Sequence, residues 1–106
     1  MTDILNRVRV VAERKVLFLP HALRQMLRPN RMISTAEVRR VIAKGGVIEN
    51  YPEDTRGPSC LLLGLGDEGR PIHVVCAPKD DYLAIITAYL PDASEWSNDF
   101  KVRTRK

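Results

Sequence analysis

Hydrophobic residues recur at helical spacing up to residue 44 and at strand-like spacing from residue 46 onward. Segment 2–14, TDILNRVRVVAER, places apolar side chains three and four residues apart, which predicts an amphipathic helix. Segment 20–28, PHALRQMLR, opens with a proline, and proline suits the first turn of a helix. Between them, KVLFL at 15–19 is typical of either a short strand or an extended link.

The sequence marks the third helix most clearly, in ISTAEVRRVIAKGG at 33–46. Ser34 and Glu37 have the spacing of a capping box, in which each side chain accepts a hydrogen bond from the other residue's backbone N–H. Ile33 and Val38 stand at the positions of a hydrophobic staple. We expect Gly45 to end this helix in the left-handed conformation that glycine adopts easily.

Four apolar runs separated by turn-rich stretches follow this helix, and each predicts a strand. Short connections favour antiparallel pairing in sequential order. The sequence therefore predicts a single α+β domain over 1–106, with a helical half at 1–45 packed on one face of a roughly four-stranded antiparallel meander at 46–91. A C-terminal segment with a basic tail, 92–106, completes it. The four runs are GVIENY, SCLLLGL, PIHVVCA and YLAIITAYL.

The last two strands place polar side chains together. In PIHVVCA one face is wholly apolar and suits the helices, while His73 lies on the other face. A register that pairs Ala77 with Leu83 would set His73 directly across from Thr87. We therefore expect His73, Thr87 and Tyr89 to form a polar cluster on the open face of the sheet, outside the core. In this register the open face of the last strand carries Leu83, Ile85, Thr87 and Tyr89.

Composition narrows the class of protein. Apolar residues make up 44% of the 106 residues and charged residues 28%, which is ordinary for a globular protein and not for a disordered one. No apolar run is long enough to cross a bilayer, and Asn6, Arg7 and Arg9 interrupt the position of a signal peptide, so we expect a cytoplasmic protein. Cys60 and Cys76 are expected to be buried, reduced thiols, and neither a metal nor an organic cofactor is expected.

Charge is segregated along the chain, although the formal net charge is only +4. Residues 1–44 carry ten Lys or Arg against three acids, residues 45–98 carry three against nine, and the tail is again basic. This distribution indicates a polyanion partner such as RNA, or an acidic protein. A merely solvated, charge-segregated surface would give the same pattern.

Five sequence blocks resemble the bacterial domain-of-unknown-function 4258 family, in the right order and over about residues 16–103. They are LPHALRQM, VIENYPEDTRGPSCLLLG, RPIHVVCA, IITAYLPD and EWSNDFKVR. The resemblance implies a fold like that of the small RelE-like RNase toxins of type II toxin–antitoxin systems. It also implies a cognate antitoxin, of the zinc-ribbon, helix-turn-helix kind, as a partner. The positions that match the family motifs are His21, Glu49, Tyr51, Pro52, His73, Thr87, Tyr89, Trp96 and Arg103.

One position departs from the family pattern. The family usually has an arginine directly before the methionine of the PHALRQM helix, and this chain has Gln25 there. Arg24 lies three residues after His21 and could share its helix face. The RPNRM segment that follows is also longer than the usual link.

Metal-independent RNA cleavage by 2′-OH attack needs a base, an acid and cations that stabilise the crowded phosphorane. Histidine titrates near neutrality, arginine matches phosphate geometry, and tyrosine can orient a phosphate or stack on a base. Taken with the toxin function that the family resemblance implies, these residue types suggest an endoribonuclease that cleaves mRNA. The catalytic candidates are His73, His21, Tyr89 and Arg103, and the substrate-binding candidates are Arg24, Arg56, Thr87, Lys101 and Arg105.

Each candidate also has a purely structural interpretation. His73 could simply hydrogen-bond a neighbouring carbonyl or hydroxyl, and His21 could cap the backbone at its helix start. Glu49 could be a solvated residue of an edge strand, and Trp96 could plug the end of the sheet. The alternative function is therefore a non-catalytic module that binds protein or RNA.

Overall fold

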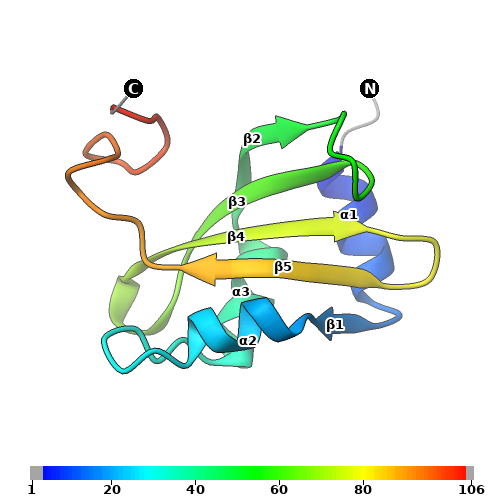
Figure 1. Ribbon diagram of the computed structural model, residues 1–106, viewed down its shortest axis with the longest axis horizontal. Coiled ribbons are helices and arrows are strands. Elements are labelled where there is room, and N and C mark those ends of the chain that lie inside the picture. Colours follow the sequence, from blue (N-terminus) through cyan, green and yellow to red (C-terminus); the bar gives the residue numbers. More distant parts are fainter. Residues whose placement is uncertain (1–3, 105–106) are drawn as a thin grey trace.

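The computed structural model describes residues 4–104 and contains three α-helices and five β-strands (Figure 1). Every helix and strand that the hydrophobic pattern predicts is present. The elements are α1 (Ile4–Ala12), β1 (Val16–Phe18), α2 (Pro20–Met26), α3 (Thr35–Lys44), β2 (Gly46–Tyr51), β3 (Ser59–Leu65), a 3-10 turn (Asp67–Gly69), β4 (Pro71–Pro78) and β5 (Leu83–Tyr89).

The sheet is mixed, with the strand order β1-β5-β4-β3-β2. Strands β2 to β5 form the predicted antiparallel meander. The prediction of a roughly four-stranded antiparallel sheet holds for these four strands, but it omitted β1, a fifth strand that runs parallel to β5. Backbone bonds from Leu83 to the Lys15 carbonyl and from Leu19 to the Ile85 carbonyl hold it in place. Three residues are too few for a period-two pattern, so the sequence could not separate this strand from a link.

Helices α1 and α3 cover one face of the sheet, and α2 lies along β5 beside β1 (Figure 1). Side chains from all three helices contribute to the main core. None of the helices within residues 4–104 is long and apolar enough to cross a membrane. The fully buried residues of this core include Val8, Ala22, Met26, Val38, Val41, Leu62, Ile72, Val74, Leu83 and Ile85.

A β-bulge in β5 changes the predicted register. Val75 pairs with Thr87, but the next residue of β4 pairs with Ile85, so that one residue of β5 is skipped. The predicted pairing of Ala77 with Leu83 was also wrong, because Ala77 pairs with Ala84 at the hairpin end. This shift of one residue and the bulge together set His73 across from Tyr89 and not from Thr87. Because a bulge shifts the alternation of side chains by one position, Leu83 and Ile85 point into the helix-side core and not onto the open face. The sequence carries no glycine or proline that would signal this bulge.

The ends of α3 show one confirmed prediction and one error. The capping box is present: Ser34 Oγ accepts from the Glu37 N–H at 3.0 Å, and Glu37 Oε1 accepts from the Ser34 N–H at 3.0 Å. Gly45, however, is extended (φ −80°) and not left-handed. Its glycine identity is needed for close approach, because a Cβ there would lie 2.5 Å from the Leu63 carbonyl oxygen.

Glu37 has a second task that the sequence did not indicate. Its side chain is buried and forms a paired salt bridge with Arg70, with N–O distances of 2.7 and 2.9 Å. The Asp67 N–H donates to the same carboxylate. These bonds lower the pKa of Glu37 to about 2, with the Arg70 hydrogen bonds as the largest cause. One carboxylate thus starts α3 and fixes the turn that leads into β4.

Candidate functional site

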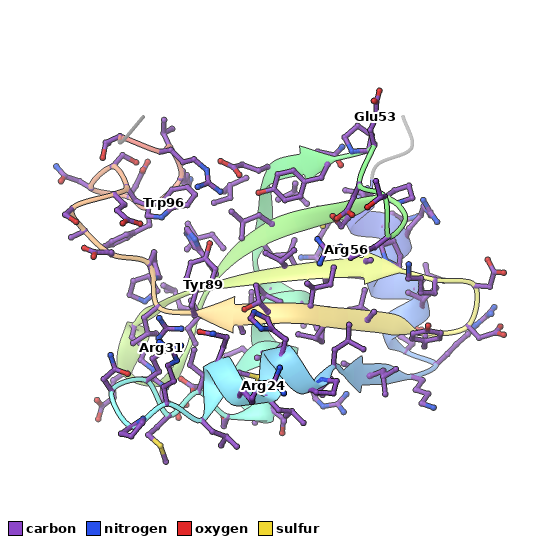
Figure 2. All side chains as sticks on the ribbon, in the orientation of Figure 1. Arg24, Arg31, Glu53, Arg56, Tyr89 and Trp96 are labelled. Carbon is purple, nitrogen blue, oxygen red and sulfur yellow. The ribbon has the colours of Figure 1, made fainter. Side chains whose placement is uncertain are left out.

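Residues 91–104, here called the C-terminal clamp, fold back at the end of the sheet where β5 finishes (Figure 1). The clamp is a loop closed by backbone bonds from Ser97 to Val102 (2.8 Å) and from Thr104 to Glu95 (2.9 Å). Trp96 lies inside this loop, is only 5% exposed, and comes from the segment next to the end of β5 (Figure 2). The clamp therefore docks through a buried aromatic side chain.

His73 lies on the open face of β4, as its position in the strand predicts, but the clamp covers it completely. Its Nδ1 is 3.3 Å from the Tyr89 hydroxyl and its Nε2 is 2.9 Å from the Phe100 carbonyl oxygen. Because a carbonyl only accepts, Nε2 carries the proton, and Nδ1 accepts from Tyr89. The Trp96 ring packs edge-on against the imidazole at 4.4 Å. Burial lowers the pKa of His73, so the ring is neutral at pH 7.

A second layer of polar side chains lies outside the imidazole. Arg103 of the clamp holds Glu49 of β2 with two hydrogen bonds, of 2.9 and 3.1 Å. Its guanidinium also stacks over the Trp96 ring at 4.7 Å, and the Tyr51 hydroxyl donates to the same carboxylate. Arg103 lowers the pKa of Glu49, whereas burial and the Glu49 charge raise the pKa of Tyr51 to about 12.

These two layers form one cluster, which we call the clamp cluster. Within it, the Arg103 guanidinium and the Glu49 carboxylate are partly exposed, with side chains 57% and 24% exposed, and Tyr51 and Tyr89 are half-buried. His73 is fully buried, so the cluster reaches solvent through its other side chains. The clamp cluster consists of Glu49, Tyr51, His73, Tyr89, Trp96 and Arg103.

The structure does not bring the two predicted helix residues to this cluster. His21 and Arg24 are exposed on α2, which packs its opposite side into the core (Figure 2). Within residues 4–104 no hydrogen bond or ion pair joins either of them to the clamp cluster. A sequence-local argument could place His21 and Arg24 on one helix face but not decide which part of the sheet that face meets.

The remaining predicted residues are dispersed. Arg56 lies in the turn between β2 and β3, toward the end of the sheet away from Trp96, where it pairs with Asp54 at 2.9 Å (Figure 2). Thr87 lies on β5 across from Val75, two residues from Tyr89. Lys101 is exposed on the clamp. Arg105 lies outside the described residues.

Two site residues were assigned too little weight from the sequence. On the sequence alone Glu49 could be a solvated residue of an edge strand, yet its carboxylate is the centre of the outer layer. Tyr51, two residues later, donates a hydrogen bond to this carboxylate. Their i, i+2 spacing on one strand was the available signal, because it puts both side chains on the same face.

Arg31 was not predicted at all. It lies in the lengthened RPNRM segment and donates to the Gln25 side chain at 2.7 Å. Its positive charge acts to lower the pKa of Tyr89, as that of Arg103 does, although burial is the larger effect and raises this pKa. The view of all side chains places Arg31 beside the end of β5 that carries Tyr89 (Figure 2). Gln25 therefore holds a guanidinium near the cluster.

The two cysteines belong to the opposite side of the sheet. Cys60 and Cys76 are free thiols, paired across β3 and β4 and buried in the helix-side core, whereas His73 faces the clamp. Across residues 4–104, no group of three or more His, Cys, Asp or Glu is arranged to hold a metal ion.

Together the fold and site define an α+β domain with a five-stranded mixed sheet and a clamped polar cluster at one end. Residues 18–90 match the family described as Domain of unknown function (DUF4258), and the chain belongs to this family. The matched region contains Glu49, Tyr51, His73 and Tyr89, while Trp96 and the rest of the clamp follow it. Searches of curated proteins and of solved structures find no match to this chain.

Proposed function

We propose that this protein is a metal-independent endoribonuclease of RelE-like fold that cleaves mRNA, and that it serves as the toxin of a type II toxin–antitoxin pair. The observation that supports the proposal is the clamp cluster itself. A carboxylate, a guanidinium and two phenols from β2, β5 and the clamp meet at one end of the sheet, around a buried imidazole. These are the groups that 2′-OH attack on a phosphodiester requires.

In this proposal Glu49 is the general base. Its lowered pKa keeps it ionised at pH 7, and RNA would bind by offering a phosphate to Arg103 in place of part of the Glu49 pair. Glu49 takes the 2′-OH proton, the 2′-oxygen attacks phosphorus, and the bond from phosphorus to the 5′-oxygen breaks. Tyr51 protonates the leaving 5′-oxygen and recovers its proton from Glu49. The products are a 2′,3′-cyclic phosphate and a 5′-hydroxyl.

His73 has a different role from the one its residue type suggests. It is buried, and both ring nitrogens are engaged, so it is a positioning residue that orients Tyr89 and anchors the clamp through Phe100. Tyr89 would then contact the phosphate between Arg31 and Arg103. A cognate antitoxin that covers this end of the sheet would inhibit the enzyme by excluding RNA.

Glu49→Gln tests the proposal directly, because it keeps the shape of the side chain and removes the base. The matched control is Glu53→Gln, an exposed glutamate in the turn after β2, away from the cluster (Figure 2). Wild type, Glu49→Gln and Glu53→Gln are induced in a bacterial host, and growth and total-RNA integrity are followed. Purified proteins are incubated with RNA in EDTA, and the new 3′ ends are analysed for cyclic phosphate.

We expect growth arrest and cyclic-phosphate ends with wild type and Glu53→Gln, and neither with folded Glu49→Gln. Full cleavage by Glu49→Gln would overturn the assignment of the base. Healthy growth and intact RNA with all three proteins would overturn the nuclease.

A non-catalytic RNA- or protein-binding module is the second candidate. Two observations favour it: Glu49 and Arg103 already hydrogen-bond to each other, and His73 is fully buried. This function predicts RNA binding that weakens steeply with salt, without any cleavage.

A further inference from the structure

Strand β2 forms one edge of the sheet and leaves its outer side open. Within residues 4–104 its only strand partner is β3. A bulge skips Ile48 in this pairing, so the pairing is irregular in the first half of the strand. An edge strand presents unpaired N–H and C=O groups and is a template for another strand.

A groove of about 510 Å³ lies beside the start of this edge, between α3 and the clamp. Val47 and Ile48 of β2 and Leu63 and Leu65 of β3 contribute apolar side chains to its lining, and Leu65 is 60% exposed. The open edge is therefore continuous with an apolar surface that the protein's described residues do not cover.

All the charged side chains that line the groove are basic. Arg40 and Lys44 come from the last turns of α3, and Lys101 comes from the clamp, so the cations flank the groove from two elements far apart in sequence. Arg40 also pairs with Asp67 at 3.3 Å, whereas no ion pair within residues 4–104 engages Lys44 or Lys101. Lys101 also interacts electrostatically with Asp99. The groove thus combines an apolar lining with charged lining residues that are all basic.

We propose that this groove is the docking site of an acidic peptide that adds to β2 as a sixth strand. Backbone pairing with β2 would supply affinity, alternate apolar side chains would contact the lining, and the intervening acidic side chains would meet the lysines. Since β2 has six residues, the paired stretch would be about six residues, or roughly 20 Å.

A peptide fits this groove better than a nucleic acid. Single-stranded RNA sites combine cations with aromatic side chains on which bases stack, and no aromatic residue lines this groove. An unpaired strand edge offers alternating N–H and C=O groups, which match a peptide backbone and not a sugar–phosphate chain. The inference goes beyond the proposed nuclease and needs no acid–base residue of the clamp cluster.

The test uses the full chain and fluorescent peptides measured by polarisation. The probe has three Glu-Val repeats, and the charge control has three Lys-Val repeats. A third peptide carries N-methyl groups on the alternate residues of one edge, which removes its ability to pair with a strand but keeps its charge. A fluorescent uridine octanucleotide tests the alternative that the groove takes RNA.

We expect the Glu-Val peptide to bind and the Lys-Val and N-methylated peptides to bind at least tenfold more weakly. Lys44→Gln and Lys101→Gln should each reduce the affinity by about two- to fivefold, as expected for one exposed charge pair. Lys15→Gln, an exposed lysine beside the opposite edge strand β1, is the matched control and should have no effect. Hydrogen exchange should slow at β2 amides when the peptide is bound.

Three outcomes would overturn the proposal: no binding of the Glu-Val peptide, equal binding of the N-methylated peptide, or equal loss of affinity in Lys15→Gln. Binding of the oligonucleotide with sensitivity to Lys44→Gln, in the absence of peptide binding, would assign the groove to nucleic acid instead. RNA cleavage is measured separately with Glu49→Gln, so failure of the groove proposal and failure of the nuclease proposal are distinguishable.

Discussion

Replacing Trp96 by alanine would show how strongly the clamp is attached. The indole is 5% exposed, contacts the His73 ring at 4.4 Å and lies under the Arg103 guanidinium at 4.7 Å. Burying a tryptophan removes roughly 150–250 Å² from water, which at about 25 cal/mol per Å² corresponds to about 4–6 kcal/mol. That figure is an upper limit, because the clamp can detach instead of leaving a cavity. We therefore expect a cost of about 3 kcal/mol.

Hydrogen exchange measures this cost where it arises. The amides of Ser97 and Thr104 donate within the clamp, to Val102 and Glu95, and should exchange on the order of 100-fold faster in Trp96→Ala, which is the ratio for about 3 kcal/mol. Amides in the middle of β4, which bond to β3 and β5, should change little as long as the variant stays folded.

The control for this variant is Val102→Ala, which changes a clamp side chain that is 62% exposed and should leave exchange almost unchanged. Unaltered protection of the clamp in Trp96→Ala would refute the reasoning, because the buried indole would then contribute nothing to docking. Equal acceleration in both variants would show that the clamp opens independently of Trp96.

Three further predictions concern the scaffold and the outer layer. The Arg70 hydrogen bonds and the backbone N–H groups of Ser34 and Asp67 together lower the pKa of Glu37 from 4.5 to about 2. These interactions should therefore contribute roughly 3 kcal/mol of stability above pH 4.5, which is lost as the pH falls toward 2. Urea unfolding from pH 6 to 3 should show this slope, and Glu37→Gln should flatten it. Gly45→Ala should lower the free energy of unfolding by about 2 kcal/mol, because the new Cβ would clash with a β3 carbonyl oxygen. The control is Gly46→Ala, whose Cβ would have no atom within 4 Å and which should change this free energy by less than about 0.5 kcal/mol. Because the pKa of Tyr51 is raised to about 12, an ultraviolet titration should show one tyrosine that ionises at unusually high pH, and this step should be absent in Tyr51→Phe. The Tyr51 hydroxyl should stabilise the fold below pH 10, and this stabilisation should be lost as the pH rises toward 12.

The scaffold was largely predictable because its signals are local. The capping box at Ser34 depends on residues three apart, and the helices and the four longer strands follow from the spacing of apolar side chains. β1 was not predicted as a strand because three residues are too few to show a strand-like alternation. The bulge in β5 was not predicted because no glycine or proline marks its position.

The site was predictable only in part. The sequence itself placed His73 and Tyr89 on one face, because strand alternation fixes faces within a few residues. It could not foresee that Glu49 and Arg103, 54 positions apart, would form an ion pair. Nor could it foresee that Trp96 would seal the imidazole from solvent. Such contacts depend on how the chain closes in space, and the tertiary structure alone decides which distant side chains share one buried volume.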